Sequence, residues 1–123
     1  MILCCGEALI DMLPRETAAG ETAFLPLAGG SVFNSAIALG RLNVPTGFFS
    51  GLSSDFFGEV LRDALARSNV DYSYSAISDS PTTLACVRLV DGQARSACYY
   101  YYSALRLLSA RCIPLLDSTH RAL

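Results

Sequence analysis

The chain has 123 residues, the length of one domain or of part of a larger one. Hydrophobic residues make up 52% of it, enough for a sizeable core, which argues against disorder. Its formal net charge of −2 comes from 9 basic and 11 acidic residues without a basic block, so nothing indicates binding to nucleic acid or to an anionic membrane.

The N-terminal stretch MILCCGEALIDML is apolar but is interrupted by Glu7 and Asp11. Because it lacks both a charged leading region and a long apolar run, it predicts neither a signal peptide nor a membrane span. We therefore expect a cytoplasmic protein. The run from 2 to 13 itself predicts a buried strand.

A polar loop over 14–22 and a short extended segment over 22–27 lead to Gly29 and Gly30. At Ser31 the apolar period changes to that of a helix, which we expect to end at the Asn-Val-Pro sequence of residues 43–45.

The next run, 46–53, predicts a second buried strand. Asp55 is expected to cap a second helix, whose core-facing residues repeat every four positions at Phe57, Leu61 and Leu65. This alternation of strand and helix predicts an α/β fold with a parallel, doubly wound sheet.

Beyond residue 70 the pattern becomes antiparallel. Two β-rich runs over 82–101, separated by Asp91-Gly92, predict a hairpin with a two-residue turn. Such a turn sets Arg88 opposite Arg95, which is tolerable only on a solvated face. The tail from Ser103 has no clear period.

The five cysteines and the single histidine do not form a metal-site pattern. There is no C-x-x-C pair, Cys4 and Cys5 are adjacent, and His120 has no suitably spaced cysteine partner. Because zinc sites need three or four spaced ligands, we predict no metal ligands and interpret the cysteines as small hydrophobes in a reducing compartment.

The helix start after Gly29-Gly30 is the first candidate site. Its unpaired N–H groups can bind anions or lone pairs, and glycines permit close approach of a ligand. Asn34 can donate and accept together, as suits an oriented alcohol. The chain has neither G-x-G-x-x-G nor G-x-x-x-x-G-K-[ST], so polyol recognition fits better than phosphate recognition.

Asp11 is the second candidate. We expect it at the end of the first strand, at the carboxyl edge of a parallel sheet where open α/β sheets bind ligands, and its carboxylate can accept two hydroxyl hydrogen bonds. Two simpler interpretations stay open: Asp11 as a solvated strand end, and Asn34 as a helix-start residue bonded to its own backbone.

Three stretches carry a family resemblance: GEALIDMLP, then LAGGSVFNSAIALGRLNVPTGFFSGLSSDFFGEVLRDAL, then VDYSYSAISDSPTTLACVRLVDGQAR. From about residue 2 to residue 95 the chain resembles the ribokinase-like (phosphofructokinase-B type) carbohydrate kinases, and most of all the bacterial fructokinases. The resemblance implies the N-terminal part of a ribokinase-like doubly wound sheet, with a small β lid made by strands at about 22–27 and 82–101.

The resemblance also implies functions for particular residues. Sugar hydroxyls, with fructose the expected sugar, would be bound by Asp11, Gly29, Gly30 and Asn34, and Arg106 could match a further family residue. ATP and Mg²⁺ would serve the full-length enzyme in transferring the γ-phosphate to a sugar hydroxyl, and the lid could form a homodimer. The D-x-x-G sequence beginning at Asp55 is shared with the family, yet its expected role is to cap the helix.

Two motifs that the resemblance implies, G-x-G-D for the catalytic base and anion hole and N-x-x-E for Mg²⁺ and phosphate, do not occur in the chain. We therefore expect 1–123 to be a partial kinase domain with a divergent tail at 96–123, which retains the sugar-binding part without the catalytic base or the ATP site. A frameshift, a mispredicted gene or a decayed copy would explain such a chain.

Alternatives are a non-catalytic sugar-binding or dimerising remnant and a non-functional product. Tyr99 to Tyr102 are expected as strand-end residues or as a stacking surface for a sugar ring. We also expect the isolated chain to be marginally folded and self-associating, with 46–52 as an exposed, aggregation-prone strand.

Overall fold

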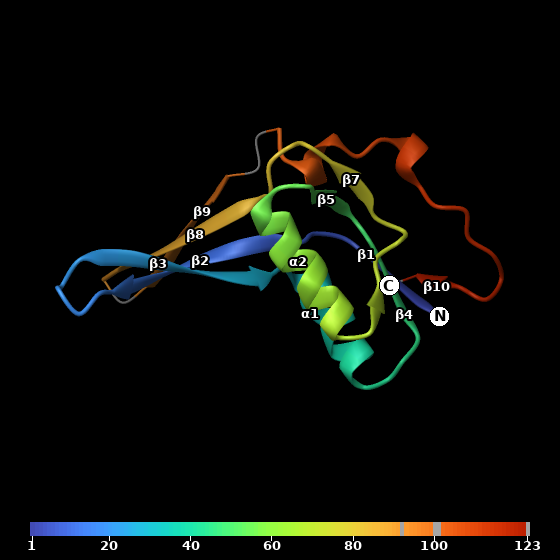
Figure 1. Ribbon diagram of the computed structural model, residues 1–123, viewed down its shortest axis with the longest axis horizontal. Coiled ribbons are helices and arrows are strands. Elements are labelled where there is room, and N and C mark those ends of the chain that lie inside the picture. The colour runs from blue at the N-terminus through green and yellow to red at the C-terminus, as the bar shows by residue number, and fades with distance from the viewer. Residues whose placement is uncertain (92, 100–101, 123) are drawn as a thin grey trace.

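The structure, a computed structural model, describes residues 1–91, 93–99 and 102–122. It consists of an α/β core, from which two β-hairpins project together as a long lid (Figure 1). The predicted turn residue Gly92 and the predicted strand-end residues Tyr100 and Tyr101 lie outside the described residues.

The core sheet is parallel throughout. Its strands, in spatial order, are β10 (Arg121–Ala122), β1 (Ile2–Cys5), β4 (Thr46–Phe49) and β6 (Val70–Asp71). Two further short strands pair in parallel beside it, β5 (Gly51–Ser53) and β7 (Ala76–Ser78). Helix α1 (Ser31–Arg41) packs against β1, β4 and β6, and helix α2 (Phe56–Arg67) packs against β5 and β6 and lies nearer the viewer in Figure 1.

Both helices begin and pack largely as predicted. The Asp55 carboxylate accepts a hydrogen bond from the Gly58 N–H at 2.7 Å, which confirms the predicted cap of α2, and Leu61 and Leu65 are fully buried. In α1, Phe33 is buried, and its ring meets that of Phe48 edge to face with centroids 5.7 Å apart.

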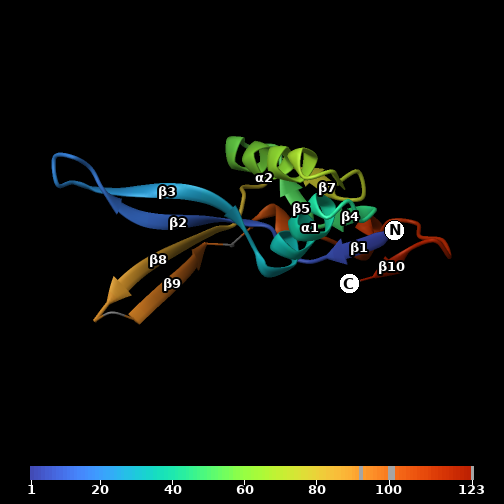
Figure 2. The same cartoon turned by 90° about the horizontal axis from the view of Figure 1, so that it is seen from below.

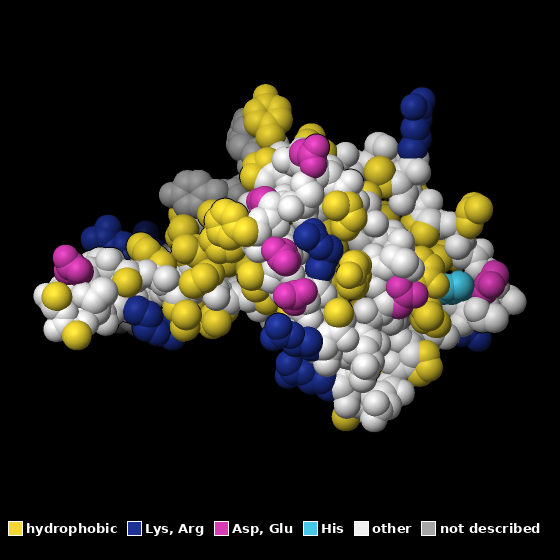
Figure 3. Space-filling model, viewed as in Figure 1, with side chains coloured by type: hydrophobic (Ala, Val, Ile, Leu, Met, Phe, Trp, Pro, Cys, Tyr) yellow, Lys and Arg dark blue, Asp and Glu magenta, His cyan; other side chains and the backbone are white. Residues whose placement is uncertain are grey.

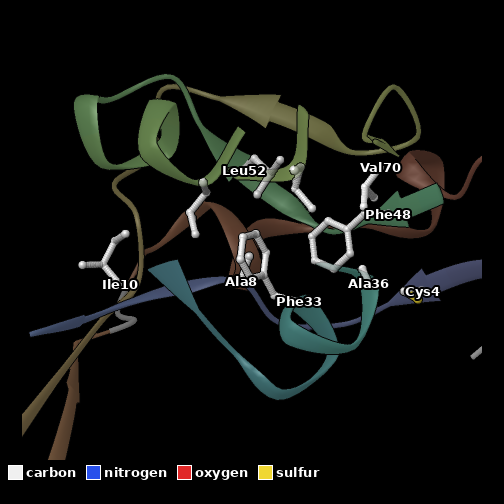
Figure 4. Close-up of a cluster of buried hydrophobic side chains, with 10 residues drawn as sticks. Cys4, Ala8, Ile10, Phe33, Ala36, Phe48, Leu52 and Val70 are labelled. Atoms are coloured by element: carbon white, nitrogen blue, oxygen red, sulfur yellow. The ribbon is translucent and has the colours of Figure 1, made fainter. Parts of the chain in front are cut away.

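These side chains belong to one hydrophobic core between the helices and the strands. Figure 4 shows its members converging from the two layers. The residues labelled there are Cys4, Ala8, Ile10, Phe33, Ala36, Phe48, Leu52 and Val70.

The prediction of one strand over 2–13 is wrong, because the chain changes sheets within it. β1 pairs with β4 in the core, whereas β2 (Leu9–Glu16) belongs to the lid. The break falls at 6–8, where Gly6 packs so closely on α1 that a β-carbon there would lie 2.6 Å from Val32 Cγ2.

The strand predicted over 46–53 is likewise divided, into β4 and β5. At the break, the Ser50 N–H donates to Ser75 Oγ at 3.2 Å, and the Ser50 carbonyl accepts from the Ala76 N–H at 2.9 Å. The prediction that this run is exposed is also wrong: β4 lies between β1 and β6, and Phe48 is fully buried.

The lid sheet is built from two hairpins. Its strand order is β3 (Thr22–Gly29), β2, β8 (Leu84–Val90) and β9 (Gln93–Tyr99). β2 and β3 pair over their full length, from Leu9 opposite Gly29 to Glu16 opposite Thr22. The polar loop predicted from residue 14 therefore starts too early. Pro14 is tolerated in β2 because β8 pairs with this strand only through Met12, so that Pro14 has a partner strand on one side alone.

The second hairpin has the pairing that was predicted from the sequence. β8 and β9 pair antiparallel, with Val90 opposite Gln93 and Arg88 opposite Arg95, and both arginines are exposed as expected. Asp91 has a positive φ of 51°, as a primed two-residue turn requires.

The tail forms two short 3₁₀ turns, η1 (Ala104–Leu107) and η2 (Ala110–Cys112), before β10, which the sequence did not predict. β10 is held beside β1 by a hydrogen bond from the Arg121 N–H to the Met1 carbonyl at 2.8 Å, and His120 Nε2 lies 3.1 Å from the Tyr74 hydroxyl. Across the described ranges, no helix is long and apolar enough to cross a membrane.

Replacing Phe48 by alanine tests the importance of this core. The side chain is 0% exposed, so we expect the free energy of unfolding to fall by about 3–5 kcal/mol in urea titrations. The matched control is Phe56→Ala, on a side chain that is 70% exposed, for which a loss of about 1 kcal/mol or less is expected. Equal losses in the two variants would contradict the assignment of the core.

Candidate functional site

Asp11 is the third residue of β2, opposite Leu27 on β3 and Ala85 on β8. The prediction that it ends the first strand of the parallel sheet is therefore wrong: it lies in the lid sheet, because the chain leaves the core at 6–8. Its carboxylate covers Gly29, so that a β-carbon on Gly29 would overlap Asp11 Oδ2. The missing side chain of Gly29 is what gives this half-buried carboxylate its position.

Gly30 connects the lid to α1 and has a φ of 116°, a conformation that favours glycine. Its carbonyl accepts the backbone N–H of Asn34 at 2.9 Å, which starts the helix. The Asn34 side chain is exposed and has no hydrogen-bond partner among the described residues, so it is not bonded to its own backbone. Asn34 therefore has its amide available to a ligand.

Four of the five predicted site residues thus lie along one continuous path. Asp11 contacts Gly29, Gly29 continues into Gly30, and Gly30 begins the turn that carries Asn34. Below, we call these four residues the shelf. Arg106 belongs to another element, η1, which packs against β5, and its side chain is exposed. There the Ala104 carbonyl occupies the space that a side chain at Gly51 would need.

Glu7 is a residue of this region that the sequence analysis missed. Its carboxylate oxygen Oε1 accepts hydrogen bonds from the Ser31 N–H at 3.3 Å and from the Ser31 hydroxyl at 3.0 Å. The available signal was indirect: α1 has a glycine at its N-cap position and no acidic residue in its first turn.

A phosphate group does not fit the start of α1. The Glu7 carboxylate already occupies the Ser31 N–H and brings negative charge to the place where an anion would bind. The described residues include no group of three His, Cys, Asp or Glu side chains placed to hold a metal ion. The shelf offers one carboxylate acceptor, on Asp11, and one side-chain amide, on Asn34.

A hollow of about 670 Å³ opens between the two lid hairpins, which spread apart in Figure 2. It is lined by Pro14, Thr22, Phe24, Cys86, Val87, Arg88, Val90, Arg95 and Ala97. Because successive side chains of a strand point to opposite faces, Pro14 lies on the other face of β2 from Asp11. The hollow and the shelf are therefore separate features.

The second lid hairpin is joined to the core at Asp55. In addition to capping α2, the Asp55 carboxylate accepts hydrogen bonds from the Thr82 N–H at 2.8 Å and the Thr82 hydroxyl at 2.6 Å. One residue on, the Thr83 hydroxyl donates to Ser103 Oγ at 2.9 Å, which links the two ends of the hairpin. A single carboxylate thus fixes both a helix start and the base of the lid.

The fold and the shelf together define a class: an α/β protein in which a β lid adjoins a glycine-flanked helix start. Residues 1–113 match the model of the family described as pfkB family carbohydrate kinase. The chain belongs to this family, as the sequence resemblance indicated.

Among curated proteins, the fructokinase of Rhizobium leguminosarum bv. trifolii is 54% identical over all 123 residues, including the tail. Among solved structures, the fructokinase of Xylella fastidiosa aligns with a TM-score of 0.85 at 34% identity, over 92% of this chain and 37% of that one. The fructokinase of Vibrio cholerae O395, crystallised with fructose, ADP and calcium, has a TM-score of 0.82 at 23% identity, over 98% and 39% of the two chains, and shows likeness of fold.

These alignments confirm the expected fold class, the N-terminal part of a ribokinase-like α/β sheet with its lid. The chain spans about 38% of the length of the Rhizobium relative.

The Asp55 contacts predict a pH dependence of stability. Burial would raise the pKa of this carboxyl, but the hydrogen bonds from Thr82 and Gly58 outweigh burial and lower the pKa. Stabilisation by a carboxylate whose pKa is lower in the folded state is complete above the unfolded value of about 3.9 and is lost as the pH falls through the folded value.

We therefore expect the free energy of unfolding to fall less between pH 5 and pH 3 in Asp55→Asn than in the wild type, as measured by urea titration at each pH. The control is Asp63→Asn, on the exposed face of α2, which should keep the wild-type profile. An unchanged profile in Asp55→Asn would show that these hydrogen bonds do not carry the effect.

Proposed function

We propose that the chain provides the sugar-binding shelf and the lid of a fructokinase-type kinase, an enzyme that transfers the γ-phosphate of ATP to a sugar hydroxyl. The family and the similarity to fructokinases support the reaction class. The observation that carries the proposal is the Asp11 carboxylate covering Gly29, next to the turn that presents Asn34.

Each shelf residue has a defined part in this proposal. The Asp11 carboxylate accepts hydrogen bonds from sugar hydroxyls, and its partial burial limits competition from water. The Asn34 amide donates to one hydroxyl oxygen and accepts from another hydroxyl. Gly29 leaves room for the Asp11 carboxylate and Gly30 for the Glu7 backbone, so the two glycines hold the binding groups in place. We infer fructose as the sugar, because the relatives at 54% and 34% identity are fructokinases.

The remaining parts of the reaction are assigned to residues outside this chain. The sequences G-x-G-D and N-x-x-E do not occur in its 123 residues, and the start of α1 does not fit a phosphate. ATP with Mg²⁺ supplies the phosphoryl group in the complete enzyme. We propose that residues 1–123 form part of the kinase domain and hold the sugar without transferring phosphate, so the chain alone acts as a sugar-binding unit.

Two further proposals accompany this function. Arg106 is kept as a proposed additional sugar contact, although it lies on η1 and not on the shelf. A cytoplasmic location is supported by the free thiols of Cys4, Cys5, Cys86 and Cys112.

Fructose binding by the purified chain tests the shelf. Each of Asp11→Ala and Asn34→Ala removes hydroxyl contacts worth roughly 1.5–3 kcal/mol, so we expect titration calorimetry to show affinity losses of about 10-fold to 150-fold. The matched control, Asp63→Ala on the solvent-exposed face of α2, should bind fructose with wild-type affinity. No ADP should form when ATP and Mg²⁺ are added.

Wild-type affinity in Asp11→Ala or Asn34→Ala would remove that residue from the site. Fructose-dependent ADP formation by the purified chain would contradict the assignment of catalysis to residues outside it.

We also propose that the chain forms a homodimer through the lid. Phe24, Leu25 and Leu27 of β3 are 48%, 42% and 41% exposed, and apolar side chains gather where the lid leaves the core (Figure 3). An exposed apolar edge strand favours association.

Sedimentation velocity at micromolar concentration is expected to show a dimer, and Leu25→Lys, which puts a charge on β3, should shift it to the monomer. The control is Leu42→Lys, at the exposed end of α1, which should remain dimeric. A monomeric wild-type chain would contradict the proposal.

A further inference from the structure

The first turn of α1 lacks the features that usually stabilise a helix start. Its N-cap residue is Gly30, which has no side chain to accept a hydrogen bond, and the first turn contains no acidic residue. Helix α2, by contrast, has Asp55 as its cap and Glu59 in its first turn. The start of α1 therefore depends on groups from elsewhere in the chain.

The Glu7 carboxylate, 24 residues before Ser31 in the sequence, stabilises this helix start. Its Oε1 atom accepts from both the N–H and the hydroxyl of Ser31, so one carboxylate provides both the missing acceptor and the missing negative charge. Ser31 is the first residue of α1, where the partial positive charge of a helix is greatest.

The backbone around Glu7 is also packed against the same turn. A β-carbon on Gly30 would lie 2.7 Å from the Glu7 carbonyl oxygen and 3.2 Å from Glu7 Cγ. One residue earlier, a β-carbon on Gly6 would lie 2.6 Å from Val32 Cγ2. The loop between β1 and β2 thus lies directly against residues 30–32, and the Glu7 carboxylate reinforces an existing contact.

This contact connects the two halves of the shelf. Glu7 lies four residues before Asp11, in the loop that leads to β2. Ser31 lies three residues before Asn34, in the first turn of α1. Resting on the proposed function, we propose that Glu7 is a positioning residue for sugar binding: it fixes the start of α1 relative to β2, and with it the placement of Asn34 relative to Asp11.

Three substitutions separate positioning from direct contact with the sugar. Glu7→Ala removes both hydrogen bonds, and because the loss of a helix cap costs on the order of 1 kcal/mol, fructose affinity should fall about 5-fold to 10-fold. Glu7→Gln keeps an acceptor at Oε1 but loses the negative charge, so its loss of affinity should be smaller, about 2-fold to 3-fold.

Ser31→Ala removes the hydroxyl donor and should weaken binding about 2-fold to 3-fold. Added to Glu7→Ala, it should cost nothing further, because both changes break the same contact. The control is Glu59→Ala, which removes an exposed first-turn acid from α2 and should bind fructose like the wild type.

A second measurement does not require sugar binding. In hydrogen exchange of the unliganded chain, amides of residues 31–36 should exchange faster in Glu7→Ala than in the wild type, and Glu7→Gln should restore their protection. If the wild-type chain failed to bind fructose, the proposed function would fall, and these exchange rates would decide whether Glu7 fixes the helix start.

Three results would overturn the positioning role of Glu7. The first is unchanged exchange at residues 31–36 in Glu7→Ala. The second is a loss of fructose affinity in Glu7→Gln as large as that in Glu7→Ala, with Ser31→Ala unaffected, which would indicate a direct charged contact with the sugar. The third is full additivity of the Glu7→Ala and Ser31→Ala losses.

Discussion

The backbone at Gly29 and Gly30 runs so close to the segment from Glu7 to Asp11 that neither glycine has room for a β-carbon. At Gly29 the space is filled by the Asp11 carboxylate, and at Gly30 by the Glu7 carbonyl oxygen. Here the chain passes from the core into the lid and back: residues 6–8 lead into β2, and β3 leads through Gly30 into α1. A side chain at Gly29 would displace the Asp11 carboxylate, and one at Gly30 would push against the Glu7 backbone, so either would disturb the shelf.

The two lid hairpins are attached to the core by different physical means. The hairpin of β2 and β3 is held by the steric contact at the two glycines, where α1 begins. The hairpin of β8 and β9 is held by hydrogen bonds, from Thr82 to Asp55 and from Thr83 to Ser103. The two hairpins also pair with each other, through the three residue pairs that join 10–12 of β2 to 84–86 of β8.

Much of this architecture could be predicted because its signals are local. The hairpin at Asp91 and the helix cap at Asp55 each depend on a few neighbouring residues, and both are confirmed. The double glycine and Asn34 indicated a helix start with an available amide, which the structure also has. The sugar-binding role of these residues stays a prediction.

The features that sequence reasoning missed depend on distant partners. The apolar run 2–13 does not reveal that its two halves pair with different strands, β4 and β3. The predicted position of Asp11 was wrong for this reason. Glu7 has no local pattern, because its partner Ser31 lies 24 residues away. β10 pairs over two residues only, too short a segment to leave a periodic signal.

The central claim, that the shelf formed by Asp11, Gly29, Gly30 and Asn34 binds a sugar, is tested most directly by titrating the isotope-labelled chain with fructose and following its backbone amides by NMR. The account predicts saturable chemical-shift changes centred on residues 11 and 29–34. Saturable changes confined to the hollow between the lid hairpins or to the tail after Ser103, or no changes at millimolar fructose, would contradict it.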